Sequence, residues 1–206
     1  MKLQDLPSIL PLYAASGTVL LPRAQLPLLL HEGDEKDLIN FSLKSGNRLI
    51  GVIQVHPEGG HFQKGCVGRI LNFQDGLQFF TTLGGICRFE IEDILEEYPV
   101  KLAKVSYKGF ETDLDERLTD PLVDRPRLLS LLKSYLDDQQ ITTNWEEINH
   151  ASDELIISSL TMVCPFKPIE KQAILEMGSL AERCHMMIAL MEMASPHLAG
   201  QAPILH

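Results

Sequence analysis

The stretch ILNFQDGLQFFTT, residues 70–82, decides how the first half of this chain folds. Two apolar runs flank Asp75-Gly76, which is the pattern of two strands folded back on each other around a tight turn. A two-residue turn at Asp75-Gly76 would place Phe73 opposite Gln78, and the apolar faces of the two strands would then disagree. A longer loop is therefore needed.

A three-residue loop over residues 74–76 brings the apolar faces into agreement, with Gly76 supplying the left-handed conformation that such loops require. We prefer this register because a slip of one residue turns a whole apolar face outward. It pairs Phe73 with Leu77, Leu71 with Phe79, Arg69 with Thr81 and Val67 with Leu83.

Several other short apolar runs predict more strands. Pro27 places its strand at a sheet edge or at a strand start. The continuous apolar run 49–55 predicts a strand buried on both faces, and the alternation in 87–92 predicts a half-buried strand with Arg88 facing out. A bulge or bend is expected at Gly84-Gly85. The remaining predicted strands are residues 18–21, 26–30 and 100–107, and a helix capped by Asp34 is expected over residues 35–43.

The second half of the chain has helical periodicity instead. Asp124 precedes one helical repeat, Ser152 is a candidate cap for a second, Pro168 opens a third, and Ser179 begins a capping box for a fourth. The fold class that follows is α+β, a bent β-sheet pseudo-barrel followed by a C-terminal helical bundle. We expect a β-rich part over residues 1–115 and an α-helical part over residues 116–206. The apolar positions expected to face inward are Leu128, Leu131, Leu132, Tyr135 and Leu136, then Leu155, Ile156, Leu160 and Val163, then Leu180, Cys184, Met187, Ile188 and Met191.

Composition and net charge indicate which partners and which cellular location this protein has. The chain has 206 residues, 45% of them hydrophobic, and a formal net charge of −10. That charge disfavours nucleic acid and anionic membrane surfaces as partners. Asp5, Pro7 and Pro11 interrupt the apolar run near the N-terminus, so it does not predict a secretion signal, and no membrane span is expected. These observations favour a cytoplasmic location, with the four cysteines as buried reduced thiols.

The sequence contains none of the common patterns of catalytic or ligand-binding residues. Residues 60–65 have the glycine spacing of a phosphate loop, but Cys66-Val67 follows where such a loop needs lysine and a hydroxyl. No HExxH, CxxC or GxSxG pattern is present, so the sequence predicts no catalytic residues, no cofactor and no metal site.

Three segments together resemble the substrate-binding N-terminal domain of Lon proteases. The first carries Leu10-Pro11-Leu12, Val19-Leu20-Leu21-Pro22 and Leu26-Pro27-Leu28 with Glu32. The second carries Gly65, Ile70, Phe73 and Asp75-Gly76, followed by Gly85 and Arg88-Phe89. The third is the helical end, with Glu170-Lys171-Gln172, Leu175-Glu176 and Ala181-Glu182-Arg183.

The resemblance covers about residues 8–194. It implies a PUA-like pseudo-barrel packed on helices. It also implies a non-catalytic module that binds unfolded or extended polypeptide or an unidentified protein partner, with weak self-association as a further option. In Lon proteases the ATPase and peptidase modules follow this domain. Because the chain stops at 206, we expect it to lack them and to hydrolyse neither peptides nor ATP.

The candidate binding surface follows from the same segments. It consists of Pro22, Arg23, Leu26, Pro27, His31, Glu32 and Arg88. After the second Leu-Pro-Leu, residues 29–35 depart from the Ile-Phe-Glu-Pro-Arg-Tyr that is usual in the family. Two alternatives stay open. One is a PUA-like nucleic-acid-binding protein, and the other is an enzyme whose site is assembled from distant loops.

Overall fold

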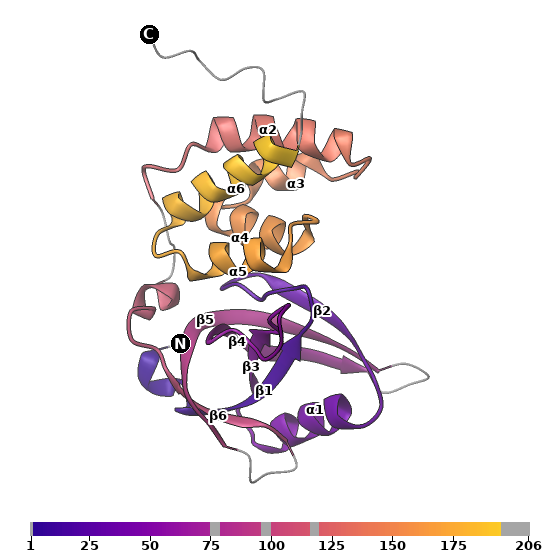
Figure 1. The fold of residues 1–206 in the computed structure, drawn as a ribbon, viewed down its shortest axis with the longest axis vertical. Coiled ribbons are helices and arrows are strands. Elements are labelled where there is room, and N and C mark those ends of the chain that lie inside the picture. Colours follow the sequence, from indigo (N-terminus) through magenta and orange to yellow (C-terminus); the bar gives the residue numbers. More distant parts are fainter. Residues whose placement is uncertain (1, 75–78, 96–99, 116–119, 195–206) are drawn as a thin grey trace. The chain divides into compact units, whose positions relative to one another are not determined.

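A computed structural model describes residues 2–74, 79–95, 100–115 and 120–194 (Figure 1). The chain divides into two compact units. The first consists of residues 1–118 with 158–176, and the second of residues 119–157 with 177–206. Helix α4 (Asp153–Val163) contributes residues to both units. The division at residues 115 and 116 that the sequence suggested stays a prediction.

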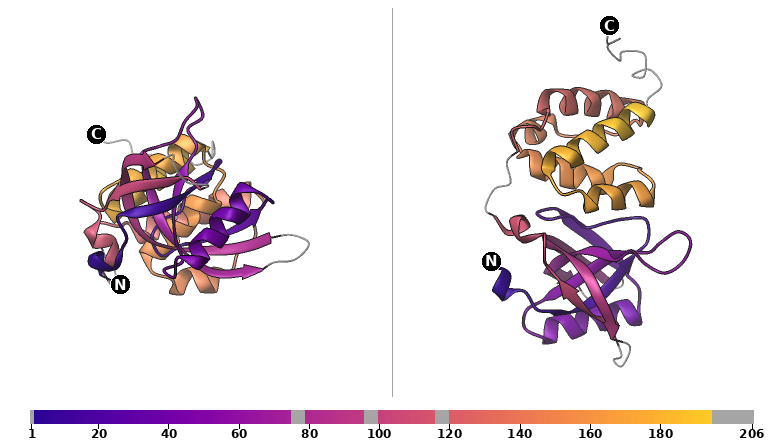
Figure 2. Two further views of the ribbon diagram at one scale, coloured as in Figure 1. Left: turned by 90° about the horizontal axis from the view of Figure 1, so that it is seen from below. Right: turned by 60° about the vertical axis from the view of Figure 1, so that its left-hand side comes forward.

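The first unit is built on a six-stranded sheet that closes on itself. The spatial order is β2-β5-β4-β3-β1-β6, and β5 also pairs with β6, which joins five of the strands into a ring. Both views in Figure 2 show these strands curling round instead of lying flat. The predicted class, a bent pseudo-barrel with helices, is therefore confirmed. The strands are β1 (Ile9–Ala15), β2 (Gln25–Leu30), β3 (Leu49–Gln54), β4 (Lys64–Gln74), β5 (Phe79–Leu95) and β6 (Leu102–Ser106).

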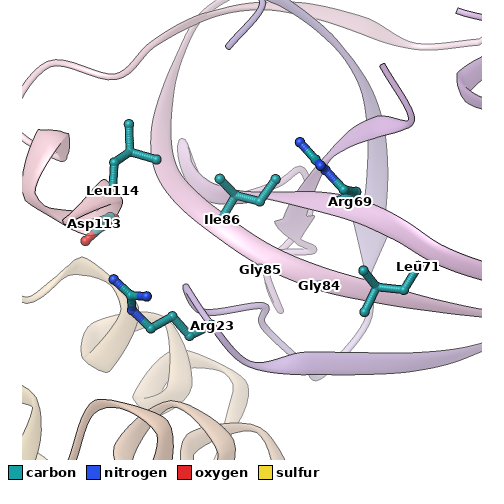
Figure 3. A pocket seen from close by; sticks show the side chains of 8 residues that line it. All are labelled: Arg23, Arg69, Leu71, Gly84, Gly85, Ile86, Asp113 and Leu114. Carbon is teal, nitrogen blue, oxygen red and sulfur yellow. The ribbon is translucent and has the colours of Figure 1, made fainter. Parts of the chain in front are cut away.

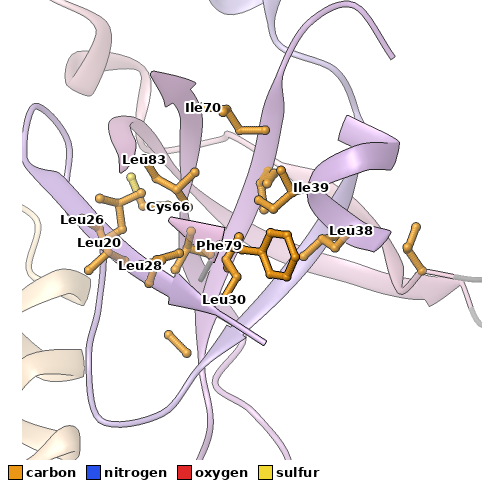
Figure 4. Packing of buried hydrophobic residues seen from close by; sticks show 14 of the residues in the cluster. Leu20, Leu26, Leu28, Leu30, Leu38, Ile39, Cys66, Ile70, Phe79 and Leu83 are labelled. Atoms are coloured by element: carbon orange, nitrogen blue, oxygen red, sulfur yellow. The ribbon is translucent and has the colours of Figure 1, made fainter. Parts of the chain in front are cut away.

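Two clusters of buried apolar side chains lie on the two faces of this sheet. One collects residues from all five strands of the ring, including Leu10, Val67 and Phe89. The other lies under β2 and helix α1 (Asp34–Lys44), and Figure 4 shows residues of both elements gathered around Phe79. Because β3 contributes to both clusters, all of its residues are buried, as its unbroken apolar sequence predicted.

The register predicted for the β4–β5 hairpin is wrong. Arg69 lies opposite Gly84 instead of Thr81, and Val67 lies opposite Cys87 instead of Leu83. Phe73 lies opposite Thr81 instead of Leu77, and Leu71, which was expected opposite Phe79, falls at an irregularity between Ile70 and Asn72. The loop expected at Asp75-Gly76 lies outside the described part of the chain. The offset is already present next to the loop, where Gln74 lies opposite Phe80, so the segment that joins the strands is longer than the assumed three residues. The two irregularities in the ladder each change the register by one residue, and one of them lies next to Gly85, where a bulge was expected.

Two further predictions in this unit fail. Residues 18–21 form no strand, and β1 occupies residues 9–15 instead, where it pairs in parallel with β3. Arg88 does not face solvent, because its side chain is buried together with Asp113. A charged residue at an outward position of a strand is usually exposed. Arg88 is buried because the Asp113 carboxylate, far away in the sequence, pairs with it.

The helices begin largely where the sequence indicated. The Asp124 carboxylate caps the second helix by accepting from Arg127 N–H, and Ser179 and Glu182 form the predicted capping box. Helix α1 differs slightly, because Gly33 occupies the cap position expected for Asp34. Leu155 and Val163 on α4 are exposed, contrary to prediction. The other helices are α2 (Arg125–Asp138), α3 (Trp145–His150), α5 (Pro168–Glu176) and α6 (Leu180–Ala194), with short 3-10 turns η1 (Leu3–Asp5) and η2 (Glu111–Leu114).

Candidate functional site

Strand β2 lies at an edge of the sheet. It pairs antiparallel with the first part of β5, in a register that sets Pro27 opposite Thr82 and Leu29 opposite Phe80. Within the described ranges, no strand pairs with the other side of β2. Pro27, which has no N–H to contribute to a ladder, is tolerated at such an edge, as the sequence predicted. An unpaired strand edge can accept an extended segment of another polypeptide.

The outer face of β2, β5 and β4 carries large apolar side chains that are not buried. Along β2 the residues alternate, so that Leu26, Leu28 and Leu30 enter the core while Leu29 faces outward. Leu29 and its cross-strand neighbour Phe80 expose 49% and 43% of their surface. A pair of exposed apolar side chains beside an open strand edge indicates a contact surface more strongly than scattered ones do. We call Leu29, Phe80 and the exposed Leu71 of β4 the apolar face.

A pocket of about 350 Å³ adjoins the apolar face (Figure 3). Leu71 and Gly84 belong to its wall, and Gly84 is the residue of β5 that pairs with Gln25 of β2. The remaining lining residues are Arg23, Arg69, Gly85, Ile86, Asp113 and Leu114. A second pocket, of about 740 Å³, shares Arg69 and Leu71 with the first and is further lined by Arg48, Asn47 and Asp5, among others.

Backbone hydrogen bonds bring three arginines to these two pockets. The Arg23 N–H donates to the Gly85 carbonyl at 2.9 Å, and Arg69 lies opposite Gly84 in the β4–β5 ladder. The Arg48 carbonyl in turn accepts from the Ile70 N–H at 2.9 Å. Figure 3 shows Arg23 and Arg69 on opposite sides of the Gly84-Gly85 segment. The glycine segment is also tightly packed, since a Cβ at Gly85 would lie 1.9 Å from the Leu21 carbonyl oxygen.

Two of these arginines have unusual backbone conformations. Arg23 has φ of 65° and Arg48 has φ of 56°, both in the left-handed region. For a residue with a Cβ this conformation costs about 1–2 kcal/mol, and strained residues tend to cluster at functional sites. Gln140 is the other non-glycine residue with positive φ among those described. The sequence thus places arginine, instead of glycine or asparagine, at two strained positions on the pocket walls.

A buried ion pair lies behind the first pocket. The Arg88 guanidinium donates to both carboxylate oxygens of Asp113 at 2.8 Å, and the Arg88 backbone N–H adds a third bond to the same carboxylate at 2.9 Å. Arg88 also donates to the Leu175 carbonyl at the end of α5, at 3.0 Å. Its guanidinium lies 4.8 Å from the centre of the Phe110 ring. Arg88 therefore joins β5, η2 and α5 within the first unit.

The residues proposed from the sequence as a binding surface do not all lie at the surface. Pro22, Leu26 and Arg88 are buried, so they cannot contact a partner without local unfolding. Arg23 is half-buried on the pocket wall. Pro27, His31 and Glu32 are exposed. The binding role of the exposed members stays a prediction.

His31 lies at the end of β2 and is tied to helix α1. Its Nδ1 lies 3.1 Å from the Glu35 carboxylate, and its backbone N–H donates to the same carboxylate at 2.7 Å. Burial raises the pKa of the nearby Tyr13 hydroxyl, and the Glu35 charge raises that pKa further. These contacts hold the loop after β2 against the start of α1.

The described residues offer no cluster of three or more histidine, cysteine, aspartate or glutamate side chains arranged to hold a metal ion. All four cysteines are free and buried. Burial raises the pKa of each thiol, to about 12 for Cys87 and to about 11 for Cys164 and Cys184. Thiols held protonated at neutral pH are poor nucleophiles. Among the helices that the structure describes, none is long and apolar enough to span a bilayer.

Sequence reasoning missed the residues that most define this surface. Leu29 could have been identified, because strand alternation places it on the same side as Pro27 and opposite to Leu28 and Leu30. Leu71 and Arg69 depend on the hairpin register, which was predicted wrongly, and Phe80 depends on the pairing of β2 with β5. Arg48 and Asp113 carry no local signal, since their position is set by contacts with strands far away in the sequence.

The fold and this surface define a class, a β-pseudo-barrel domain with an open edge strand and helices that follow it. The profile of the ATP-dependent protease La (LON) substrate-binding domain family matches residues 9–193. The chain therefore belongs to the LON substrate-binding domain family.

Individual relatives agree with this membership. The chain is 26% identical over 208 residues to a Lon protease of Cytophaga hutchinsonii, an alignment that covers 93% of this chain and 25% of that protein. The chain thus spans about a quarter of the length of this relative.

Two solved structures share the fold. One is a Lon N-terminal domain protein from Xanthomonas campestris, with a TM-score of 0.63 at 20% identity. The other is the N-terminal domain of a Lon protease from the Mycobacterium avium complex, with a TM-score of 0.66 at 16% identity. Each comparison covers 89% of this chain and 98% of the other.

Proposed function

We propose that this chain binds extended or unfolded segments of other polypeptides on the apolar face beside β2, and that its 206 residues do so without chemistry of their own. The observation that carries the proposal is the cross-strand pair of exposed apolar residues, Leu29 and Phe80, next to an unpaired strand edge. Membership of a substrate-binding family supports it. A cytoplasmic location belongs to the same proposal.

The geometry suits an extended ligand. A segment added along β2 would form main-chain hydrogen bonds that do not depend on its sequence, while the apolar face would accept alternate side chains. Such a mode favours polypeptides that expose both backbone and apolar side chains, as unfolded chains do. Burial of two to three apolar side chains corresponds to a weak, reversible complex.

A titration tests the proposal. Purified protein is added, without nucleotide, to a fluorescein-labelled polypeptide that is kept unfolded by reduction and alkylation with iodoacetamide, and fluorescence anisotropy is followed. We expect saturable binding in the micromolar range. A flat titration would overturn polypeptide capture and leave docking to a folded partner.

Variants locate the binding surface. Replacing Leu29 and Phe80 together by threonine removes apolar area and keeps a good strand former at both positions. We expect the affinity of this double variant to fall at least about tenfold, which corresponds to about 1.4 kcal/mol. Ile9→Thr is the matched control, because Ile9 is an apolar strand residue, 47% exposed, on β1. Equal losses for the control and the double variant would contradict the assignment of the surface.

A further inference from the structure

Three of the eight arginines in this chain line two adjoining pockets at one end of the apolar face. The whole chain carries a formal net charge of −10, so this local gathering of Arg23, Arg48 and Arg69 runs against its overall charge. Arginines around a concave site favour ligands with carboxylate or phosphate groups, which the planar guanidinium can bind through two hydrogen bonds.

Backbone contacts with neighbouring elements fix the main chain at all three arginines. The Arg23 N–H donates to the Gly85 carbonyl, Arg69 pairs with Gly84, and the Arg48 carbonyl accepts from the Ile70 N–H. The Arg23 guanidinium also donates to the Asp115 carbonyl, which fixes its direction along the pocket wall. This guanidinium loses little freedom when a ligand binds, which favours affinity.

The backbone conformation gives an independent reason to assign a role to these residues. Arg23 and Arg48 both have left-handed φ, where glycine or asparagine would be more stable. A strained arginine at two positions, both on the walls of adjoining pockets, is explained if the guanidinium itself is needed there.

We propose that these two pockets bind the acidic side chains of the extended polypeptide, so that the preferred ligand is an apolar segment followed by glutamate or aspartate; this inference rests on the proposed function. The apolar face and the first pocket are continuous, because Leu71 belongs to both. A polypeptide that covers Leu29 and Phe80 and continues past Leu71 therefore reaches Arg69 with its next residues.

Two acidic residues in the pocket lining do not oppose this assignment. The Asp113 carboxylate is buried and accepts from the side chain and the backbone of Arg88. Asp5 accepts from the Lys2 backbone N–H at 2.8 Å within η1. Two adjoining pockets with three arginines can hold more than one carboxylate. A chain terminus supplies a single carboxylate, whereas acidic side chains can supply several, so we assign the pockets to acidic side chains.

Three synthetic peptides test the inference by fluorescence anisotropy. Each carries fluorescein and the same apolar run of leucine and phenylalanine, followed by three glutamates, three glutamines or three lysines. In 50 mM NaCl we expect the glutamate peptide to bind about tenfold more tightly than the glutamine peptide, since several exposed charge pairs act together. The difference should shrink in 500 mM NaCl because salt screens exposed charges.

Variants then assign the preference to the pockets. Arg48→Asn together with Arg69→Gln removes two guanidinium groups, and asparagine tolerates the left-handed backbone at position 48, so the fold should be kept. We expect this variant to bind the glutamate and glutamine peptides equally, with the affinity for the glutamine peptide unchanged. Lys108→Gln, which removes an exposed positive charge of the first unit away from the pockets, is the control and should keep the preference.

The outcomes separate the two proposals. If no peptide binds, the proposed function itself fails. If all three bind equally, polypeptide binding stands and the acidic preference is wrong. If the lysine peptide binds best, or if a single-stranded RNA oligonucleotide of similar length binds more tightly than the glutamate peptide, the pockets do not serve acidic polypeptide side chains.

Discussion

The two halves of strand β5 have opposite surroundings. In the first half, from Phe79 to Gly84, β5 pairs with the edge strand β2 and exposes Phe80. In the second half, from Cys87 to Leu95, Arg88 and Phe89 are fully buried, and residues 90–95 pair with β6 and close the ring. Strand β5 thus contributes to an exposed surface at one end and to the closed core at the other.

The difference indicates which residues stabilise the fold and which are available to bind a partner. Cys87, Arg88 and Phe89 of the closed half are buried, so changes to them should affect folding. The exposed Phe80 of the open half contacts solvent, so a change there should affect binding and leave stability nearly unchanged. The Gly84-Gly85 segment joins the two halves and forms part of the wall of the first pocket.

The largest effect is expected from the buried ion pair. Replacing Arg88 by methionine leaves the Asp113 carboxylate buried without its guanidinium partner, so the free energy of unfolding should fall by about 3–5 kcal/mol. Urea unfolding followed by circular dichroism measures this loss. The double variant Arg88→Met with Asp113→Leu should recover much of the stability, because no buried charge is left. A loss below about 1 kcal/mol for the single variant would contradict the role of Arg88 in holding this unit together.

The two adjacent glycines should respond differently. A Cβ at Gly85 would lie 1.9 Å from the Leu21 carbonyl oxygen, whereas a Cβ at Gly84 would meet the Leu71 side chain at 3.1 Å. Backbone cannot move aside as easily as the end of a side chain, so Gly85→Ala should destabilise by about 1–3 kcal/mol or more. Gly84→Ala is the control, with a smaller loss. Thermal unfolding of both variants checks the order, and equal losses would contradict the packing at this segment.

The buried Cys87 thiol in the closed half should make the stability of the protein depend on pH. Burial, together with the Asp113 charge, raises the pKa of the Cys87 thiol to about 12, against about 8.5 in an unfolded chain. Above pH 8.5 the unfolded state loses this proton while the folded state keeps it. The contribution of the Cys87 thiol to the free energy of unfolding is therefore complete below about pH 8.5. It falls by about 1.4 kcal/mol per pH unit as the pH rises toward the pKa of the folded state.

Urea unfolding in reducing buffer between pH 7.5 and pH 10.5 measures this slope. The variant Cys87→Ala should lose stability less steeply with rising pH than the unchanged protein does, by about 1.4 kcal/mol per pH unit above pH 9. Parallel curves for the two proteins would show that the thiol at position 87 ionises equally in both states.

The smallest effect on stability is expected at the apolar face. Leu29→Thr and Phe80→Thr should each change the free energy of unfolding by about 0.5 kcal/mol or less, since both side chains are close to half exposed and threonine suits a strand. Urea unfolding of the single variants gives the values. Losses of about 2 kcal/mol would mean that these residues stabilise the sheet and that weaker binding by the double variant reports unfolding.

Particular residues show how far the sequence alone could lead. Pro27 indicated an edge strand, and the apolar run of β3 indicated burial on both faces, because both signals are local. The N-terminal caps of α2 and α6 and the strong bending of the sheet could also be predicted from spacing and turns. The register of β4 and β5 could not, because Gln74 already lies opposite Phe80, so the segment that joins the two strands is longer than the three-residue loop on which the prediction was built.

The binding surface depends on contacts between distant segments. Phe80 lies beside Leu29 because β2 pairs with β5, and Arg88 turns inward because Asp113, 25 residues further on, accepts its hydrogen bonds. Arg48 reaches the second pocket through a backbone bond to Ile70. Contacts between distant segments of this kind leave no periodic pattern in a single sequence.

Hydrogen exchange with and without an unfolded polypeptide shows which strands the ligand covers. The protein is saturated with the reduced and alkylated polypeptide of the titration, and amide exchange is followed by mass spectrometry. We expect slower exchange in the segments 25–30 and 79–84, with little change in β1 and β6. Protection confined to β1 and β6, or protection nowhere in the first unit, would contradict the claim that the open half of β5 and its partner β2 form the polypeptide-binding surface.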